Sequence, residues 1–286
     1  MNRRDLATKA YRAAFKLRAE QGREQNAALC PYDSATELGI DVVFADIPSL
    51  EAMYVGDDQP YVIVAADRPP GRQRFSGAHE LGHHVFGHGT HVSLIDHASL
   101  ERGGLPDEEF LVQAFAGYLL LPASAVSYAF SVRGWNPRHA VPEQFYTIAG
   151  LLGVSFEGLI TQCIFLKVLG STQAAALRAV NLPRLRAAMA GSRIDGDLVI
   201  VDEHALEMTI DLRVGDFLLT PLGVGPANDA LVVGGESSSG VLMQAERPGL
   251  SGIQRGLDSS IGVLRIARRG FVGRAVYRHL EDPGDA

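Results

Sequence analysis

The chain has 286 residues, of which 47% are hydrophobic and 21% are charged, and its formal net charge is −7. This composition is ordinary for a globular protein and leaves room for two domains and a sizeable core. A negative net charge argues against a protein that binds nucleic acid over its whole surface, although the net charge would not reveal a local basic patch.

The cysteines and the N-terminal residues indicate the cellular compartment in which the protein is expected. Cys30 and Cys163 are the only cysteines, too few for a disulfide framework and not spaced as a C-x-x-C site. Charged residues recur from the N-terminus onward and leave no apolar run for a signal peptide. We find no stretch that reaches the roughly 18 uncharged apolar residues of a membrane span, and we therefore expect a cytoplasmic protein without membrane contact.

The first elements alternate between helix and strand signals. Apolar residues recur at helical spacing over residues 3–23, which predicts an amphipathic helix packed on the domain, with a membrane-surface helix as the alternative. A short helix is expected from Cys30 to Leu38, and a strand over 40–44. Residues 51–55 and 61–65 are rich in β-branched and aromatic side chains and flank a Gly-Asp-Asp turn, which predicts a hairpin. This hairpin is a candidate for adding a peptide as an extra strand, and a purely structural sheet is the alternative.

The stretch 74–88 contains His79-Glu80-x-x-His83, the H-E-x-x-H pattern of zinc peptidases. On a helix, positions four apart lie on one face, so His79 and His83 can direct ring nitrogens at one ion. Glu80 is then placed to take a proton from a metal-bound water and pass it to a leaving amine. A cluster of histidines without a metal is the alternative. The two glycines of this helix leave room for close packing of a neighbouring backbone or for access to the metal.

Residues 89–107 show little periodicity and are interpreted as a loop or lid. Loop histidines such as His91 and His97 are expected to be solvated, with extra metal ligation as the alternative. A fourth protein ligand, for which His88, His91 and Asp96 are candidates, would favour a structural zinc, because catalysis needs an open coordination position.

A helix is predicted over 107–121, with acids in its first turn and Pro122 as its end. An H-E-x-x-H site needs a third protein ligand, and a downstream helix supplies a carboxylate in the two-His, one-Glu class. Glu108 and Glu109 are the candidates, and a capping role is the alternative for both.

Two motifs together resemble those of the ImmA/IrrE family of metallopeptidases. The first is R-F-x-x-A-H-E-L-G-H at 74–83, and the second is E-x-x-x-Q-x-F-A-x-x-L-L-L-P at 109–122. The chain departs from the family pattern at Gln113, where Asn is usual, and at Leu121, where Met is usual. The resemblance covers roughly residues 1–170.

The resemblance implies a role for each matched residue. His79 and His83 would be zinc ligands, Glu80 the general base and Glu109 the third ligand, with Glu108 as an off-register alternative. Tyr54 or a loop histidine is a candidate donor to the oxyanion. The implied activity is a limited cut in a specific protein, an XRE-like helix-turn-helix repressor, which turns on stress, mobile-element or defence genes.

Beyond the second motif the sequence says less. The pattern of residues 142–160 is typical of a helix-turn-helix, with Ser155 as an N-cap. A DNA reader would carry basic and amide residues early in its second helix, whereas Phe156 and Glu157 stand there, so a structural or protein-contacting role is expected instead of direct DNA binding. Residues 171–190 predict one helix, or two broken at Pro183.

The C-terminal part predicts short strands between turns and carries no metal, nucleotide or nucleophile motif. The expected strands are 197–201, 208–210, 216–220, 230–233, 240–243, 261–266 and 273–277. In the resembled family such C-terminal domains vary and are proposed to sense a signal or to grip the substrate.

These predictions combine into an α+β protein in three segments. A zincin-like metallopeptidase domain with a small sheet occupies 1–135, a helical helix-turn-helix-like segment and linker 136–190, and a β-rich domain 191–286. A zinc-dependent endopeptidase is the expected function. A non-catalytic zinc-containing binding protein and a DNA-binding regulator are the alternatives.

Overall fold

The structure of the chain is a computed structural model, and it describes residues 2–94, 105–205, 208–237, 239–256 and 260–280. The chain divides into two compact units, the first formed by residues 1–128 and 272–276 and the second by residues 129–271 and 277–286. The helical segment and the β-rich part, which are predicted to be separate, thus fall within one unit. The three predicted boundaries stay a prediction.

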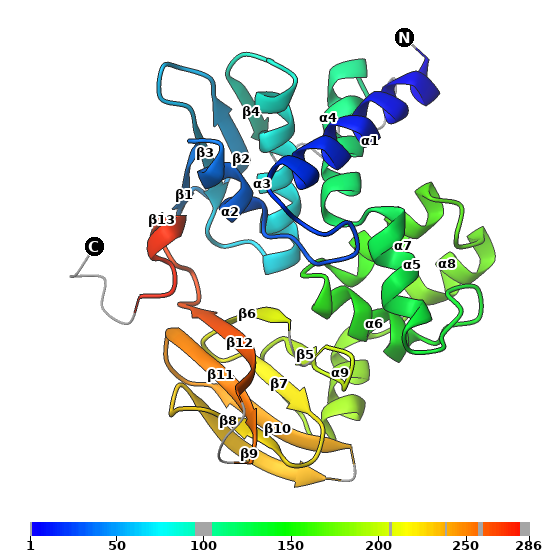
Figure 1. Cartoon of the computed structure of the whole chain (residues 1–286), viewed down its shortest axis with the longest axis vertical. Coiled ribbons are helices and arrows are strands. Elements are labelled where there is room, and N and C mark those ends of the chain that lie inside the picture. The colour runs from blue at the N-terminus through cyan, green and yellow to red at the C-terminus, as the bar shows by residue number, and fades with distance from the viewer. Residues whose placement is uncertain (1, 95–104, 206–207, 238, 257–259, 281–286) are drawn as a thin grey trace. The chain divides into compact units, whose positions relative to one another are not determined.

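Unit 1 contains a five-stranded sheet and the helices that pack on it (Figure 1). In chain order its elements are α1 (Arg3–Glu20), α2 (Pro31–Glu37), β1 (Asp41–Ala45), β2 (Leu50–Val55), β3 (Tyr61–Ala65), α3 (Pro70–Val85), β4 (His91–Leu94), α4 (Asp107–Leu120) and β13 (Gly273–Arg274). The strands are ordered β13-β1-β3-β2-β4, with β1 and β3 parallel and the other neighbours antiparallel. The predicted hairpin is therefore confirmed as β2 and β3.

Both arms of this hairpin have strand neighbours on both sides, because β3 lies between β1 and β2, and β2 lies between β3 and β4. Neither arm offers the free edge that adding a peptide would need. The edge strand on this side, among the residues that the structure describes, is β4. The prediction of a loop over 89–107 is accordingly wrong at His91–Leu94, which forms this strand.

The helices of unit 1 are fixed by a few specific contacts. α3 packs against β2, β3 and α4, and α1 packs against α4. Arg18 near the end of α1 is fully buried, and it donates hydrogen bonds to the carbonyl oxygens of Leu119 at 2.7 Å and of Glu24 and Ala27 at 2.6 Å. Burial lowers the pKa of this guanidinium to about 10, so it stays charged. α1 thereby anchors the helix that carries Glu109.

Unit 2 begins with helices and continues as two sheets. After α5 (Ala123–Ser131), which reaches both units, come α6 (Pro142–Leu151), α7 (Phe156–Phe165), α8 (Ser171–Arg178) and α9 (Leu182–Ala190). α6 and α7 are bent by 98° to each other, and the Ser155 side chain caps α7 by accepting from the Gly158 amide, as predicted. Pro183 stands in the first turn of α9, so the two-helix alternative for 171–190 is confirmed.

Two four-stranded sheets, ordered β5-β7-β10-β9 and β6-β12-β11-β8, share one apolar core. Their strands are β5 (Leu198–Ile200), β6 (Thr209–Arg213), β7 (Phe217–Thr220), β8 (Val224–Pro226), β9 (Leu231–Ser237), β10 (Gly240–Ala245), β11 (Gly249–Arg255) and β12 (Ser260–Ala267). Core residues of both sheets, such as Leu218 and Ile266, pack in the same cluster. The α+β class is confirmed, and the zincin-like arrangement stays a prediction.

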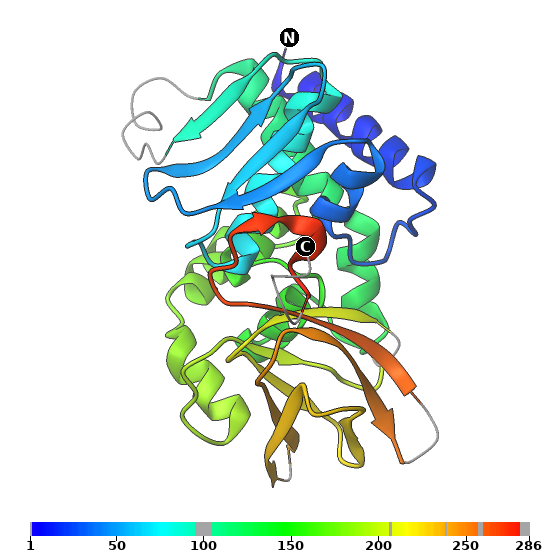
Figure 2. The same cartoon turned by 90° about the vertical axis from the view of Figure 1, so that its left-hand side faces the viewer.

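The strand expected at 273–277 is only partly correct. Gly273–Arg274 forms β13, whereas Ala275–Tyr277 is a 3-10 helix. This strand joins β1 of unit 1 instead of a sheet of unit 2, with Val43 opposite Arg274, and Figure 2 shows the red segment beside the blue strands.

One helical stretch in the described part of the chain, Asp107–Ser131, is long and apolar enough to cross a membrane, and α6 with α7 would pass the same test as a bent pair. The expectation that no such stretch exists is wrong, because α4 and α5 follow one another closely and no charged residue stands between Phe110 and Ser131. Within Asp107–Ser131, 67% of the apolar window is buried inside the protein, as in a core helix.

Candidate metal centre

α3 presents His79 and His83 on one face, with their Nε2 atoms 3.3 Å apart. This follows from the four-residue spacing on a helix of 3.6 residues per turn. His83 is 1% exposed, because α3 lies between the sheet and α4. The predicted pair is therefore brought together.

Glu109 reaches this pair from the first turn of α4. Its Oε2 lies 3.3 Å from His79 Nε2, and its Oε1 lies 3.6 Å from His83 Nε2. The close approach of the two helices depends on Gly82, where an added Cβ would lie 3.0 Å from the Cβ of Val112. The expected close packing at a glycine is thus observed. Glu108, the off-register alternative, is exposed.

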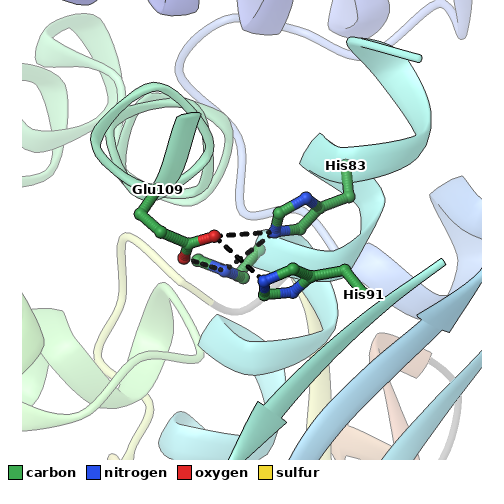
Figure 3. Close-up of side chains that lie close together, drawn as sticks. His83, His91 and Glu109 are labelled. Carbon is green, nitrogen blue, oxygen red and sulfur yellow. Dashed lines mark hydrogen bonds and ion pairs between the residues drawn. The ribbon is translucent and has the colours of Figure 1, made fainter. Parts of the chain in front are cut away.

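His91, the first residue of β4, completes the cluster. Its Nε2 lies 3.1 Å from Glu109 Oε1, and its ring stacks on that of His83 with centroids 3.9 Å apart. Figure 3 shows the side chains of His83, His91 and Glu109 converging from α3, β4 and α4. The expectation of a solvated loop histidine is wrong, because pairing with β2 sets Tyr54 opposite His91 and turns both side chains to the same face of the sheet.

Four candidate donor residues, His79, His83, His91 and Glu109, place one ligand atom each within 4.8 Å of one another. Four donors at zinc–nitrogen distances of about 2.1 Å in a tetrahedron would lie roughly 3.4 Å apart. The separations between the histidine Nε2 atoms and Glu109, which involve both carboxylate oxygens, are 3.1, 3.3 and 3.6 Å and lie near that value. Imidazole and carboxylate are also ligand types that zinc takes, so the residues fit such an ion.

The protonation states of the cluster suit a metal. Burial, together with the neighbouring rings of His79 and His91, lowers the pKa of His83 to about 3. The hydrogen bond with His79 lowers the pKa of Glu109. At neutral pH His83 is thus a neutral imidazole and Glu109 a carboxylate, which are the forms that bind metal.

A second contact orients His83 from behind. His88 Nδ1 lies 3.1 Å from His83 Nδ1, so one of the two nitrogens donates to the other. A proton on His83 Nδ1 leaves its Nε2 free to face the cluster, as metal-binding histidines require. Gly87, with φ at +68°, ends α3 in the left-handed conformation that turns the chain back and brings His88 to this position. The G-H pair after the motif is the sequence signal for this contact.

Glu80 lies beside the cluster and is fully buried. Its Oε2 is 3.9 Å from His91 Nδ1, the nitrogen on the side of the ring away from Glu109. Glu80 therefore stands one residue from one candidate ligand and next to the ring of another. A carboxylate so placed lies within reach of a molecule bound at the cluster.

The remaining candidates lie elsewhere. The Tyr54 hydroxyl forms a hydrogen bond of 2.9 Å with His84 Nδ1, and burial raises the pKa of this tyrosine. Its hydroxyl is thus engaged by a histidine outside the cluster, and the oxyanion role stays a prediction. Asp96 and His97 lie outside the residues that the structure describes.

A helix with H-E-x-x-H, a carboxylate from the next helix and a small sheet are the features of a metallopeptidase domain. Residues 35–160 match the peptidase M78 family, described as the IrrE N-terminal-like domain, so this part of the chain belongs to the ImmA/IrrE family of metallopeptidases.

A search of curated proteins gave no match. Among solved structures, a Mycobacterium tuberculosis transcriptional regulator is 20% identical, with a TM-score of 0.32, over 55% of this chain and 45% of that chain. The match thus spans less than half of that regulator.

Proposed function

We propose that this chain is a zinc-dependent endopeptidase that makes a limited cut in a specific protein. The observation that carries the proposal is the convergence of His79, His83 and Glu109, with the buried carboxylate of Glu80 beside them. It is supported by the family of residues 35–160.

The residues divide the work as follows. His79, His83 and Glu109 would hold the zinc, which when bound supplies a Lewis acid and lowers the pKa of a water. Glu80 accepts the proton of that water and delivers it to the leaving amine. His88 keeps the His83 ring in the tautomer that the site needs, through the contact of 3.1 Å.

The substrate we propose is an XRE-like helix-turn-helix repressor in the cytoplasm, whose cleavage switches on stress, mobile-element or defence genes. This assignment rests on the family resemblance of the two motifs. Direct DNA binding is not proposed, because Glu157 in the first turn of α7 is exposed and would repel phosphates, and it pairs with Arg178 at 2.7 Å.

The test is co-incubation with the helix-turn-helix protein encoded beside this chain, with zinc and with chelator, followed by mapping of any cut. Glu80→Gln should retain zinc and lose cleavage by a factor of roughly 100 or more, because it keeps the shape of the side chain without its basicity. Undiminished cleavage by a zinc-loaded Glu80→Gln variant would contradict the mechanism.

A second candidate function is favoured by His91. A zinc with four protein ligands is of the structural kind, so the chain would be a regulatory binding protein whose zinc only holds the fold. In that case neither the native chain nor any variant at position 91 would cut the partner, although the native chain would bind it.

A further inference from the structure

The arrangement around His91 differs from that of the other candidate ligands. His79, His83 and Glu109 come from two packed helices, whereas His91 comes from a strand of four residues. This strand is hydrogen-bonded to β2 alone among the described strands, and its register shifts between Leu50 and Ala52. A short edge strand with an irregular ladder opens at a lower free energy than packed helices do.

The His91 ring also occupies the place that a reacting water would need. Its Nε2 faces Glu109 at 3.1 Å, and its Nδ1 faces Glu80 at 3.9 Å. The ring therefore lies between the third ligand and the general base. With His91 as a fourth donor, a tetrahedral zinc keeps no position for water, and Glu80 has no water to act on.

We infer that His91 is a displaceable fourth zinc ligand that holds the centre in a closed, inactive state, and that cleavage requires its withdrawal together with β4. This regulation rests on the proposed function, since only a peptidase has an activity to hold back. The two helical histidines and Glu109 keep the ion while the edge strand moves. Withdrawal of one imidazole opens the fourth position and uncovers Glu80 in the same movement.

The first experiment counts ligands and needs no substrate. X-ray absorption of the zinc-loaded native protein should show three imidazoles and no water, and His91→Ala should show two imidazoles and one added oxygen. Acetohydroxamate, a small chelating probe of an open position, should bind His91→Ala at least tenfold more tightly than the native protein. Two imidazoles in the native protein, or equal binding of the probe to both, would overturn the inference.

Two further variants serve as controls, one for misfolding of His91→Ala and one for a general disturbance of β4. His91→Asn keeps a polar side chain on β4, so it covers the case in which His91→Ala does not fold, and it too should lose one imidazole. Val92→Ala changes the neighbouring residue, whose side chain is 47% exposed, and should leave the count at three. A loss of imidazole in Val92→Ala would mean that any change in β4 disturbs the site, and the inference would fail.

The second experiment tests whether β4 must move for cleavage to occur. Met53 and Val92 are opposite each other in β2 and β4, one residue from the pair of Tyr54 and His91. Opposite residues of antiparallel strands have Cα atoms about 4.5–5.5 Å apart, within the range that a disulfide spans. The double variant Met53→Cys with Val92→Cys, when oxidised, should therefore tie β4 to β2 and hold His91 in place.

The oxidised double variant should cut the partner at least tenfold more slowly than the same protein after reduction, while each single cysteine variant should be insensitive to the reductant. Equal rates before and after reduction would overturn the displacement. If no form cuts and the native zinc has three imidazoles, the ligand assignment stands and the proposed peptidase function fails. If cleavage is seen and the native zinc has two imidazoles, the peptidase function stands and the assignment of His91 fails.

Discussion

At the scale of single residues, two adjacent glutamates have opposite surroundings. Glu109 touches three histidine rings, at distances between 3.1 and 3.6 Å, whereas Glu108 is exposed. A helix turns by about 100° per residue, so only one of two neighbours can face α3. The pair offers a matched test of the ligand assignment.

We predict that Glu109→Gln weakens zinc binding by more than the roughly 10–100-fold that loss of an outer partner costs, because an amide oxygen carries no charge. Glu108→Gln should bind zinc as the native chain does. Competition with a chelator of known affinity measures both. Equal affinities for the two variants would remove Glu109 from the ligand set.

At the scale of elements, the contact between α3 and α4 sets the distance between the histidines and Glu109. An added Cβ at Gly82 would lie 3.0 Å from the Cβ and 3.3 Å from the Cα of Val112, and 3.1 Å from the ring of Phe115. Val112 and Phe115 are both fully buried, so neither can move aside without displacing others. Gly82 is therefore a packing residue of the site.

Gly82→Ala should lower the free energy of unfolding by a net of about 1 kcal/mol, since overpacking costs about 1–3 kcal/mol and a better helix former returns about 1. It should also weaken zinc binding, because α4 carries Glu109. Gly89→Ala is the control, as nothing lies within 4 Å of its added Cβ. Urea unfolding of the two variants measures the difference in their free energies of unfolding. A Gly82→Ala variant as stable as its control would contradict the close packing of α3 against α4.

The elements also show what sequence reasoning can reach. His79, His83 and Glu109 follow from fixed spacing within helices and from the paired motifs. His91 does not, because the strand that positions it has only four residues and is defined by pairing with β2, far away in the chain. β11 is missed for a related reason. Gly249 and Gly252 weaken its strand signal, and its neighbours β12 and β8 supply the hydrogen bonds.

At the scale of the whole molecule, a strand from the last part of the chain joins the sheet that the first part of the chain forms. β13 pairs with β1 through two register positions, and Arg274 forms an ion pair of 2.5 Å with Asp41. Both side chains are about half exposed, so this ion pair adds little. The backbone pairing matters more, since without it β1 would become an open edge.

A chain that ends at Phe271 should therefore lose protection at the amide of Phe44, which points toward β13, whereas the amide of Val43 points toward β3 and should keep its protection. Each backbone hydrogen bond contributes about 0.5–1.5 kcal/mol, so amide exchange in β1 should quicken by roughly 3–10-fold per bond lost. A chain that ends at Leu280 keeps β13 and is the matched control.

Zinc affinity should be the same in both truncated chains, because β13 and β4 form opposite edges of the sheet in the order β13-β1-β3-β2-β4. Exchange in β12 reports on unit 2 separately, so a general loss of structure there is distinguishable from a local opening of β1. Unchanged exchange at Phe44 in the shorter chain would show that β1 does not depend on β13. A loss of zinc in that chain alone would show that the far edge of the sheet supports the metal centre.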